Sequence, residues 1–399
     1  MNLDFVRHAR WLDRERAVGY AKILALAYVP LLVIPYLYAI GTQPGGRPSV
    51  DFMSFWSAGS LFWRDPASAY DAAAQIAFQA EAFQSHGRYL PFLYPPPFLA
   101  LVAPLALIPF TVAYPTWVAA TYAVYLASAR RLLRAGAWPI AVFPALYVNA
   151  VQGQTAALFA GLFVAAGLLM ARRPFVAGLV FGCLIFKPQL GLLIPIALIA
   201  GGFWRTLLGA ALSSLALLLL ALIAFGPETY AAFVGAGSTS LGLLQEGSSL
   251  GWAKVQSLYG ALRQIGAPPW AAIGLQGLLS LAAAGGVAWV WRSGADMLTR
   301  MAALATGALL ATPYVLDYDF VLLIVPLCWL ARRGIESGFR PWEKLLLLAV
   351  YVTPLICRQA ALALGFNLMP LLVVGLFVLI GSTTLRGAAP AGEVRSAVR

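Results

Sequence analysis

Long apolar stretches recur from one end of this chain to the other, and many are about 15 to 25 residues long. A helix needs about 20 apolar residues to cross a hydrocarbon core about 30 Å thick. Only 11% of the residues are charged and the mean hydropathy is +0.81, whereas a soluble domain carries about 25% charged residues. We therefore expect an all-α polytopic membrane protein that forms a single integral membrane domain over residues 1–399.

The basic residues predict how the chain is oriented. The net charge is +12, and short clusters such as Arg130-Arg131, Arg172-Arg173 and Arg332-Arg333 separate apolar runs. This pattern is typical of cytoplasmic connections rather than of a nucleic-acid-binding surface. It predicts a cytoplasmic basic N-terminus over 1–20 and a cytoplasmic tail over 386–399. It also predicts a first external loop at 42–96 and a second long external loop at 226–268.

About 12 transmembrane helices are expected, within a range of 10 to 13. The ambiguity lies in residues 97–129, which are too long for one straight helix and contain Pro104, Pro109 and Pro115. Several expected spans are short enough to be tilted, broken or partly re-entrant. Besides 97–129, the expected spans are 21–40, 138–151, 155–171, 175–186, 190–203, 206–225, 269–291, 297–311, 318–331, 343–357 and 369–385.

The first external loop begins with an unusual stretch, "SVDFMSFWSAGSLFWRDPASAYD", residues 49–71. Its carboxylate, Asp51, precedes an aromatic segment, 52–63, that we expect to be an amphipathic helix lying in the membrane interface. An acid at a hydrophobic membrane edge is expensive to desolvate and is a candidate for function. Asp51 also stands where a helix N-cap would be, and both interpretations remain open from the residues alone.

Three further external motifs carry polar groups. Tyr94, in "YLPFLYPPPF", belongs either to a rigid turn that leads into the next span or to the wall of a site opposite Asp51. Lys187, in "FKPQ", is a lone cation that either snorkels to the headgroups or holds an anionic lipid phosphate. Amide side chains suited to hydrogen-bonding sugar hydroxyls flank these motifs at Asn149, Gln152, Gln154 and Gln189.

The segment "TPYVLDYD" places two acids, Asp317 and Asp319, on either side of a tyrosine. They either mark a solvated loop or bind a sugar or an ion. Arg358 is a further external cation and a second candidate for phosphate binding. With only two histidines in the chain, a His-rich metal site is excluded. No cofactor is required by the sequence, and no metal-ligand spacing demands a divalent cation on the acids. No Walker loop, dinucleotide fingerprint or nucleophilic triad is present.

Taken in order, several motifs resemble those of the polyprenol-phosphate-sugar-dependent glycosyltransferases of family 87. They are Asp51 with "FWSAGSL", then "YPPPF", "QGQTAALF", "AGLVFGCLIFKPQLGLL" and "TPYVLDYDFVLLIVPL". The resemblance runs from about residue 20 to about residue 335. That family is similar to the wider GT-C superfamily, which implies a GT-C-type bundle in the bacterial inner membrane with its active site on the external or periplasmic face.

The resemblance also implies a mechanism. The donor would be a polyprenyl-phosphate sugar, typically mannose, and the acceptor an external lipid or glycan. Asp51 would be the general base of an inverting transfer, and Lys187 and Arg358 would bind the donor phosphate. The mycobacterial mannosyltransferases carry histidine in the segment equivalent to "TPYVLDYD", whereas this chain has none after residue 86. The donor sugar and the acceptor therefore stay open.

A polytopic transporter or flippase of lipid-linked or small polar substrates is the main alternative, and a non-catalytic assembly subunit is a third. Transporters typically place their polar residues near the bilayer midplane inside broken helices. Here the candidate residues collect between spans on one predicted face. That distribution favours chemistry on a lipid-linked substrate at the membrane surface, with no role for nucleic acid.

Overall fold

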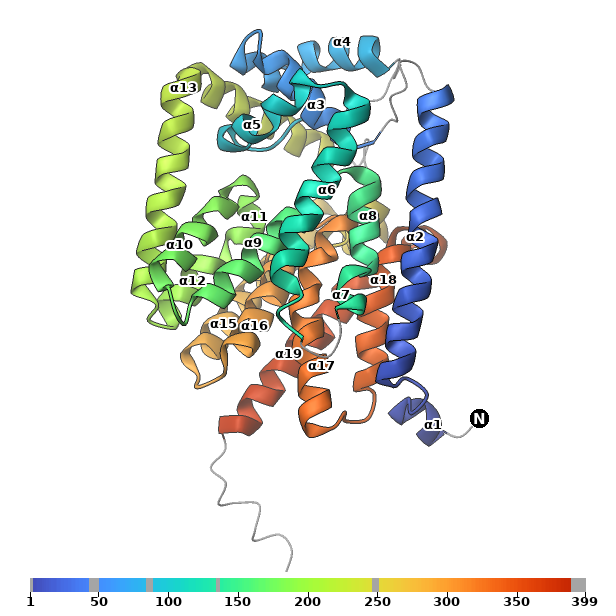
Figure 1. Ribbon diagram of the computed structural model, residues 1–399. Helices are drawn as coiled ribbons and strands as arrows, with labels where there is room; N and C mark the ends of the chain where they lie inside the picture. The colour runs from blue at the N-terminus through green and yellow to red at the C-terminus, as the bar shows by residue number, and fades with distance from the viewer. Residues whose placement is uncertain (1–2, 43–49, 84–88, 134–136, 246–250, 389–399) are drawn as a thin grey trace, which may run out of the picture.

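The computed structural model describes residues 3–42, 50–83, 89–133, 137–245 and 251–388. Within these ranges the chain is helical, and its extended pairing is limited to an isolated bridge between Val255 and Leu316. The all-α prediction is confirmed. The two longest helices, α2 (Arg14–Thr42) and α13 (Trp204–Gln245), stand upright at opposite sides of the molecule in Figure 1. The helices α15 (Pro269–Arg292), α18 (Glu343–Leu364) and α19 (Met369–Ala388) lie in its lower half.

Five helices of the described chain are long and apolar enough to cross a membrane: Arg14–Thr42, Trp204–Gly237, Pro269–Arg292, Glu343–Leu364 and Met369–Arg386. The expected number of about 12 spans is not confirmed. The other apolar runs form mostly shorter helices, namely α5 (Pro96–Val102), η3 (Ala103–Leu107), α6 (Phe110–Ala129), α7 (Trp138–Ala141), α8 (Pro144–Gln152), α9 (Ala156–Leu169), α10 (Pro174–Gly182), η4 (Cys183–Phe186), α11 (Pro188–Gly191), α12 (Leu193–Ala200), α16 (Met297–Ala311), η6 (Asp317–Leu323) and α17 (Ile324–Ser337).

Proline explains much of this segmentation. Pro96, Pro144, Pro174 and Pro188 each stand at the start of a helix, where the missing N–H is not needed and the fixed φ suits the first turn. The ambiguous region 97–129 breaks at the short 3₁₀ helix η3 and at Pro109, and then continues as the 20-residue helix α6. The sequence indicated the breakers but not which of them interrupts the chain, since α6 runs through Pro115.

The expected external loop at 226–268 is largely helical. Gly226 adopts φ +80°, and α13 bends there and continues to Gln245. Two short helices follow, η5 (Trp252–Lys254) and α14 (Leu258–Gln264). The predicted end of the span 206–225 coincides with this kink, because Gly226 can adopt a positive φ that interrupts the helix, and Pro227 suits the first turn of the stretch that follows.

The segment predicted to be the first external loop folds into α3 (Phe52–Phe62), η2 (Pro66–Tyr70) and α4 (Ala72–Phe83), which lie with α5 at one end of the molecule (Figure 1). Nine of the 11 residues of α3 are buried, so this helix does not have the one-sided exposure expected of an amphipathic interfacial segment. It packs against η2, α4, α5 and η3. The single side chain of Phe55 contacts the rings of Phe92, Tyr94, Phe98 and Trp117. This aromatic packing fixes where α3 begins.

The best-buried part of the chain is the sequence α16–η6–α17. Twelve of the 15 residues of α16 are buried, and so is every residue of η6. The bounds of α16 coincide with the predicted span 297–311. Because η6 is enclosed, its two acids, Asp317 and Asp319, lie in the protein interior rather than in a solvated loop.

Candidate active site

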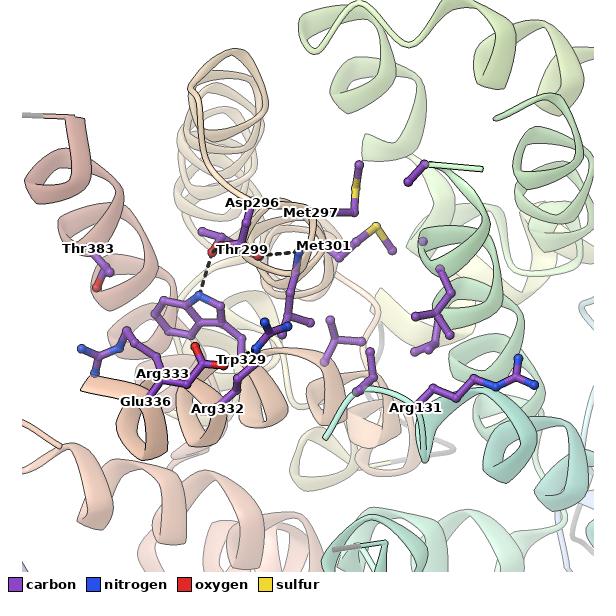
Figure 2. Close-up of a pocket in the computed structure, with 17 residues that line it drawn as sticks. Arg131, Asp296, Met297, Thr299, Met301, Trp329, Arg332, Arg333, Glu336 and Thr383 are labelled. Atoms are coloured by element: carbon purple, nitrogen blue, oxygen red, sulfur yellow. Dashed lines mark hydrogen bonds and ion pairs between the residues drawn. The ribbon is translucent and has the colours of Figure 1, made fainter. Parts of the chain in front are cut away.

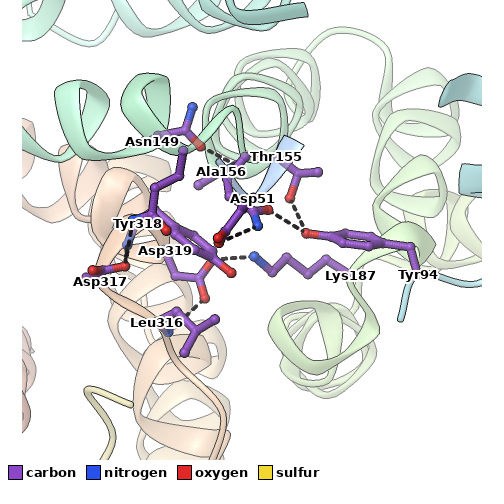
Figure 3. Close-up of polar contacts among 12 residues, drawn as sticks. Asp51, Tyr94, Asn149, Thr155, Ala156, Lys187, Leu316, Asp317, Tyr318 and Asp319 are labelled. Atoms are coloured by element: carbon purple, nitrogen blue, oxygen red, sulfur yellow. Dashed lines mark hydrogen bonds and ion pairs between the residues drawn. The ribbon is translucent and has the colours of Figure 1, made fainter. Parts of the chain in front are cut away.

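A cavity of about 160 Å³ lies where α3, the turn before α5, the start of α9, α11, η5 and η6 meet. Figure 3 shows the polar groups in and around it. Six of the residues predicted from the sequence line this cavity: Asp51, Tyr94, Gln154, Lys187, Gln189 and Asp319. They come from segments up to 268 residues apart, so the fold brings together what the sequence shows only as separate motifs.

Asp51 stands at the N-cap position of α3, but its carboxylate makes no capping hydrogen bond. Its Oδ2 instead accepts from Gln154 Nε2 at 3.1 Å and from Lys254 Nζ at 3.0 Å. The residue is 8% exposed and lines the cavity. The sequence left open whether the Asp51 side chain caps the helix, and in the structure it does not. A carboxylate kept in a polar cavity by two donors is available for chemistry.

Lys187 turns inward rather than toward a lipid headgroup. It forms a buried ion pair with Asp319, and its Nζ lies 4.9 Å from the centroid of the Tyr318 ring. The other carboxylate oxygen of Asp319 accepts from the backbone N–H of Leu316 at 3.0 Å. Asp319 is therefore held from two sides. Burying a charge costs several kcal/mol unless it is paired, which explains why Lys187 and Asp319 meet here.

Lys254, a residue that the sequence did not single out, completes the site. Besides Asp51 it faces the Tyr318 ring, with Nζ 5.7 Å from the centroid. Its helix η5 is held beside η6 by the Val255–Leu316 bridge and by a bond from Gln256 N to Val315 O at 2.8 Å. The one available signal was its isolation in "GWAKVQ", which is the same signal that drew attention to Lys187.

A short chain of hydrogen bonds connects Tyr94 to Asp51. The Tyr94 hydroxyl donates to Gln154 Oε1 at 3.0 Å and lies 3.0 Å from Thr155 Oγ1. Burial raises the pKa of Tyr94 above its usual value, so the hydroxyl stays protonated at neutral pH. With its oxygen occupied, the Gln154 amide must present its N–H to Asp51, which fixes the orientation of the carboxylate.

Four other predicted residues lie near the cavity without lining it. Asn149 accepts from the backbone N–H of Ala156 at the start of α9, at 2.9 Å. Gln152 donates to Asp317 Oδ1 at 3.2 Å. Burial raises the pKa of Asp317, while the charges of Lys254 and Arg358 and the bond from Gln152 act against that rise. Arg358 itself is exposed on α18.

The cavity combines two carboxylates, two ammonium groups and one shared aromatic ring. Each charge has an opposite partner, Asp51 with Lys254 and Asp319 with Lys187. Among the residues that the structure describes, no three His, Cys, Asp or Glu side chains are grouped so as to hold a metal ion. An incoming anion can replace either carboxylate as the partner of a lysine, because each ammonium group has three hydrogen-bond donors.

Comparison with known proteins assigns the chain to a family. The chain gave no match to curated proteins or to solved structures. The family model for glycosyltransferase family 87 matches residues 92–313, more than half of the chain. Gln154, Lys187 and Lys254 lie inside the matched segment, while Asp51 and Asp319 reach the same cavity from outside it. The chain belongs to glycosyltransferase family 87.

Proposed function

We propose that this protein transfers a sugar, mannose in the simplest case, from a polyprenyl-phosphate-linked donor to a hydroxyl of an external lipid or glycan, with inversion. The family supports glycosyl transfer as the reaction class. The observation that carries the rest is the cavity in which the Asp51 carboxylate faces two buried lysines. Of the helices long and apolar enough to cross a membrane, α13 contributes Phe233 to the lining of this cavity, in keeping with a lipid-linked donor.

Asp51 is proposed as the general base. Both of its hydrogen bonds fall on Oδ2, and Oδ1 accepts none from the part of the chain that the structure describes. This leaves Oδ1 for an acceptor hydroxyl, which a base must approach to within about 3 Å. Gln154 and Lys254 hold the carboxylate in place through Oδ2.

Lys187 and Lys254 are proposed to bind the donor phosphate. Both ammonium groups lie over the ring of Tyr318, and both lysines line the cavity. Fixed cations stabilise charge that grows on a leaving group during the reaction. Arg358, the second cation expected from the sequence, is exposed and does not line the cavity. Lys254 takes the role that was predicted for Arg358.

In the proposed step the acceptor oxygen attacks the anomeric carbon while Asp51 takes its proton. The bond from that carbon to the phosphate oxygen breaks, and its electron pair leaves on the polyprenyl phosphate. Gln154 and Gln189 offer amide groups to the sugar hydroxyls. The proposed site opens to the external face of the bacterial inner membrane, which is the face expected from the charge pattern of the sequence.

The test uses the full chain purified into nanodiscs with polyprenyl-phosphate-mannose and candidate lipid and glycan acceptors. We expect sugar transfer by the wild type and a fall of about 100-fold or more for Asp51→Asn, since general-base catalysis contributes about that much. Asp65→Asn is the matched control, because Asp65 is an exposed acid in the same external segment whose capping bond asparagine can keep.

Three results would count against the proposal. Equal turnover by the wild type and Asp51→Asn would remove Asp51 from the mechanism. Transfer from a nucleotide sugar but not from the lipid-linked donor would exclude the proposed donor class. Passage of a labelled solute across proteoliposomes, without sugar transfer, would favour the transporter or flippase.

A further inference from the structure

A second cavity, of about 550 Å³, lies between α9, α16, α17 and α19. Figure 2 shows it, with Arg131 on one side and Arg332, Arg333 and Glu336 on the other. It has no lining residue in common with the cavity around Asp51. The reaction proposed above does not use it, and the inference drawn here does not depend on that reaction.

Most of the wall of this second cavity is apolar. Val164, Gly167 and Leu168 of α9 face Leu298 and Met301 of α16 across it. Trp329 of α17 closes one side, and its indole N–H is already satisfied by Thr299 Oγ1 at 2.9 Å. A wall of this composition favours a hydrocarbon chain over a hydrated solute, because apolar burial stabilises the former by about 0.8 kcal/mol per CH₂.

The rim of the cavity is cationic. The carboxylate of Asp296 is committed to the start of α16, where it accepts from Leu298 N, Thr299 N and the Thr299 hydroxyl. Glu336 binds the Nε of Arg332 at 2.8 Å, which leaves the terminal nitrogens of that guanidinium available. The Arg131 side chain makes no hydrogen bond or ion pair within the described residues. Arg131 and Arg332 can therefore both bind an anion.

The depth of the cavity in a membrane follows from α19. Thr383 lines the cavity and lies within the apolar span Met369–Arg386, three residues before its end. Leu168, on the opposite wall, is 39% exposed. The arginines thus stand where an apolar span ends, which is the depth of lipid headgroups, and the apolar wall extends from there toward the hydrocarbon.

We propose that this cavity binds an anionic glycerophospholipid, with its phosphate at the rim that carries Arg131 and Arg332 and the upper part of one acyl chain along α9 and α16. Guanidinium groups suit phosphate because their N–H groups form paired, charge-assisted hydrogen bonds. The cavity is distinct from the proposed donor site, and its two carboxylates are already engaged.

Native mass spectrometry of the full chain in detergent, titrated with phosphatidylglycerol, tests this site. We expect the double variant Arg131→Gln/Arg332→Gln to weaken binding by about ten-fold or more, the loss expected for charged hydrogen bonds. Arg172→Gln/Arg173→Gln is the matched control, since these arginines are an exposed pair next to α9 that does not line the cavity. Glu336→Gln, which frees Arg332, should tighten binding.

Folding is checked by the elution volume and the melting temperature of each variant, which we expect to be unchanged because Arg131 and Arg332 are exposed. Equal weakening by the two double variants would show general surface attraction and overturn the proposal. Competition by inorganic phosphate would assign the rim to a soluble anion instead. Sugar-free polyprenyl phosphate is the last competitor. If it displaces phosphatidylglycerol from the wild type but not from Arg131→Gln/Arg332→Gln, the cavity binds the product lipid, and the proposal of a glycerophospholipid is wrong.

Discussion

Lys254 joins the proposed base to the proposed phosphate site, so its removal should have two separable effects. Lys254→Met leaves the Asp51 carboxylate buried beside an apolar side chain, and breaking a buried pair costs roughly 3–5 kcal/mol. We also expect the KM for the donor to rise by about ten-fold or more. Lys254→Arg keeps the cation and should lose much less. Melting temperatures and donor titrations in nanodiscs measure the two effects.

The double variant Lys254→Met/Asp51→Asn separates these effects. Asparagine removes the unpaired charge, so the double variant should recover much of the stability lost in Lys254→Met. It should remain inactive, because the base is gone. Recovery of activity together with stability would mean that Lys254 and Asp51 support the fold alone.

Tyr318 places one aromatic ring against both lysines, at 4.9 Å and 5.7 Å. Cation–π contacts contribute about 0.5–2 kcal/mol each. Tyr318→Phe keeps the ring and should leave the KM for the donor close to that of the wild type, whereas Tyr318→Leu should raise it about ten-fold. An equal rise in KM for both variants would assign the effect to the hydroxyl rather than to the ring.

The pH dependence of stability has a contribution from Asp317, whose pKa burial raises above its ordinary value of 3.8. A carboxyl with a raised pKa holds its proton more tightly when folded, so stability falls as pH rises from about 3.8 through the raised value. Asp317→Asn cannot ionise and should flatten this decline. Melting temperatures of both proteins across acidic pH check it, and parallel curves would contradict it.

The residues of the site show where sequence reasoning stops. Lys187, Lys254 and Arg358 are all isolated cations in apolar surroundings. Only packing decides that η5 carries Lys254 to Asp51, 203 residues away, while α18 leaves Arg358 exposed. Asp51 was identifiable because its acid stands alone among aromatics, but its partners were not, since no local pattern encodes a contact of that sequence separation.

At the scale of single elements, α3 positions Asp51 by aromatic packing. Phe55 is 1% exposed and meets five rings. Phe55→Ala should cost about 3–5 kcal/mol, since it opens a cavity, and should lower kcat because the start of α3 loosens. Phe55→Leu preserves more side-chain volume, so its stability and kcat should lie between those of the wild type and Phe55→Ala. Chemical denaturation and turnover measured on the same preparations test this. A kcat untouched by Phe55→Ala would show that Asp51 does not depend on this packing.

Elements with a clear start and end in the sequence were predictable. The span 297–311 coincides with α16, and 269–291 differs from α15 by one residue, because Pro269 and Asp296 mark helix starts. The chain at 226–268 was not predictable as helix. A Gly-Pro pair can end a helix or kink it, and the outcome depends on neighbours such as η2, which packs against α13 and whose Tyr70 meets the ring of Phe233.

At the scale of the whole molecule, the two cavities are predicted to lie at opposite faces of the membrane. The Asp51 site lies beside the segment predicted to be external, and the arginine-rimmed cavity lies among clusters predicted to be cytoplasmic. Thiol labelling measures the side on which each segment lies. Single cysteines at Asp65 and Arg172, both exposed positions, are suitable reporters once Cys183, Cys328 and Cys357 are replaced by alanine.

In intact spheroplasts a membrane-impermeant thiol reagent should label Asp65→Cys and leave Arg172→Cys unmodified until the membrane is permeabilised. This result follows if α2, with only 6% of its apolar window buried against the protein, crosses the bilayer and delivers α3 to the outside. The reverse pattern would place the Asp51 cavity on the cytoplasmic side. Labelling of both positions in intact spheroplasts would mean that both lie on the external side, and the predicted orientation of the segment between them would be wrong.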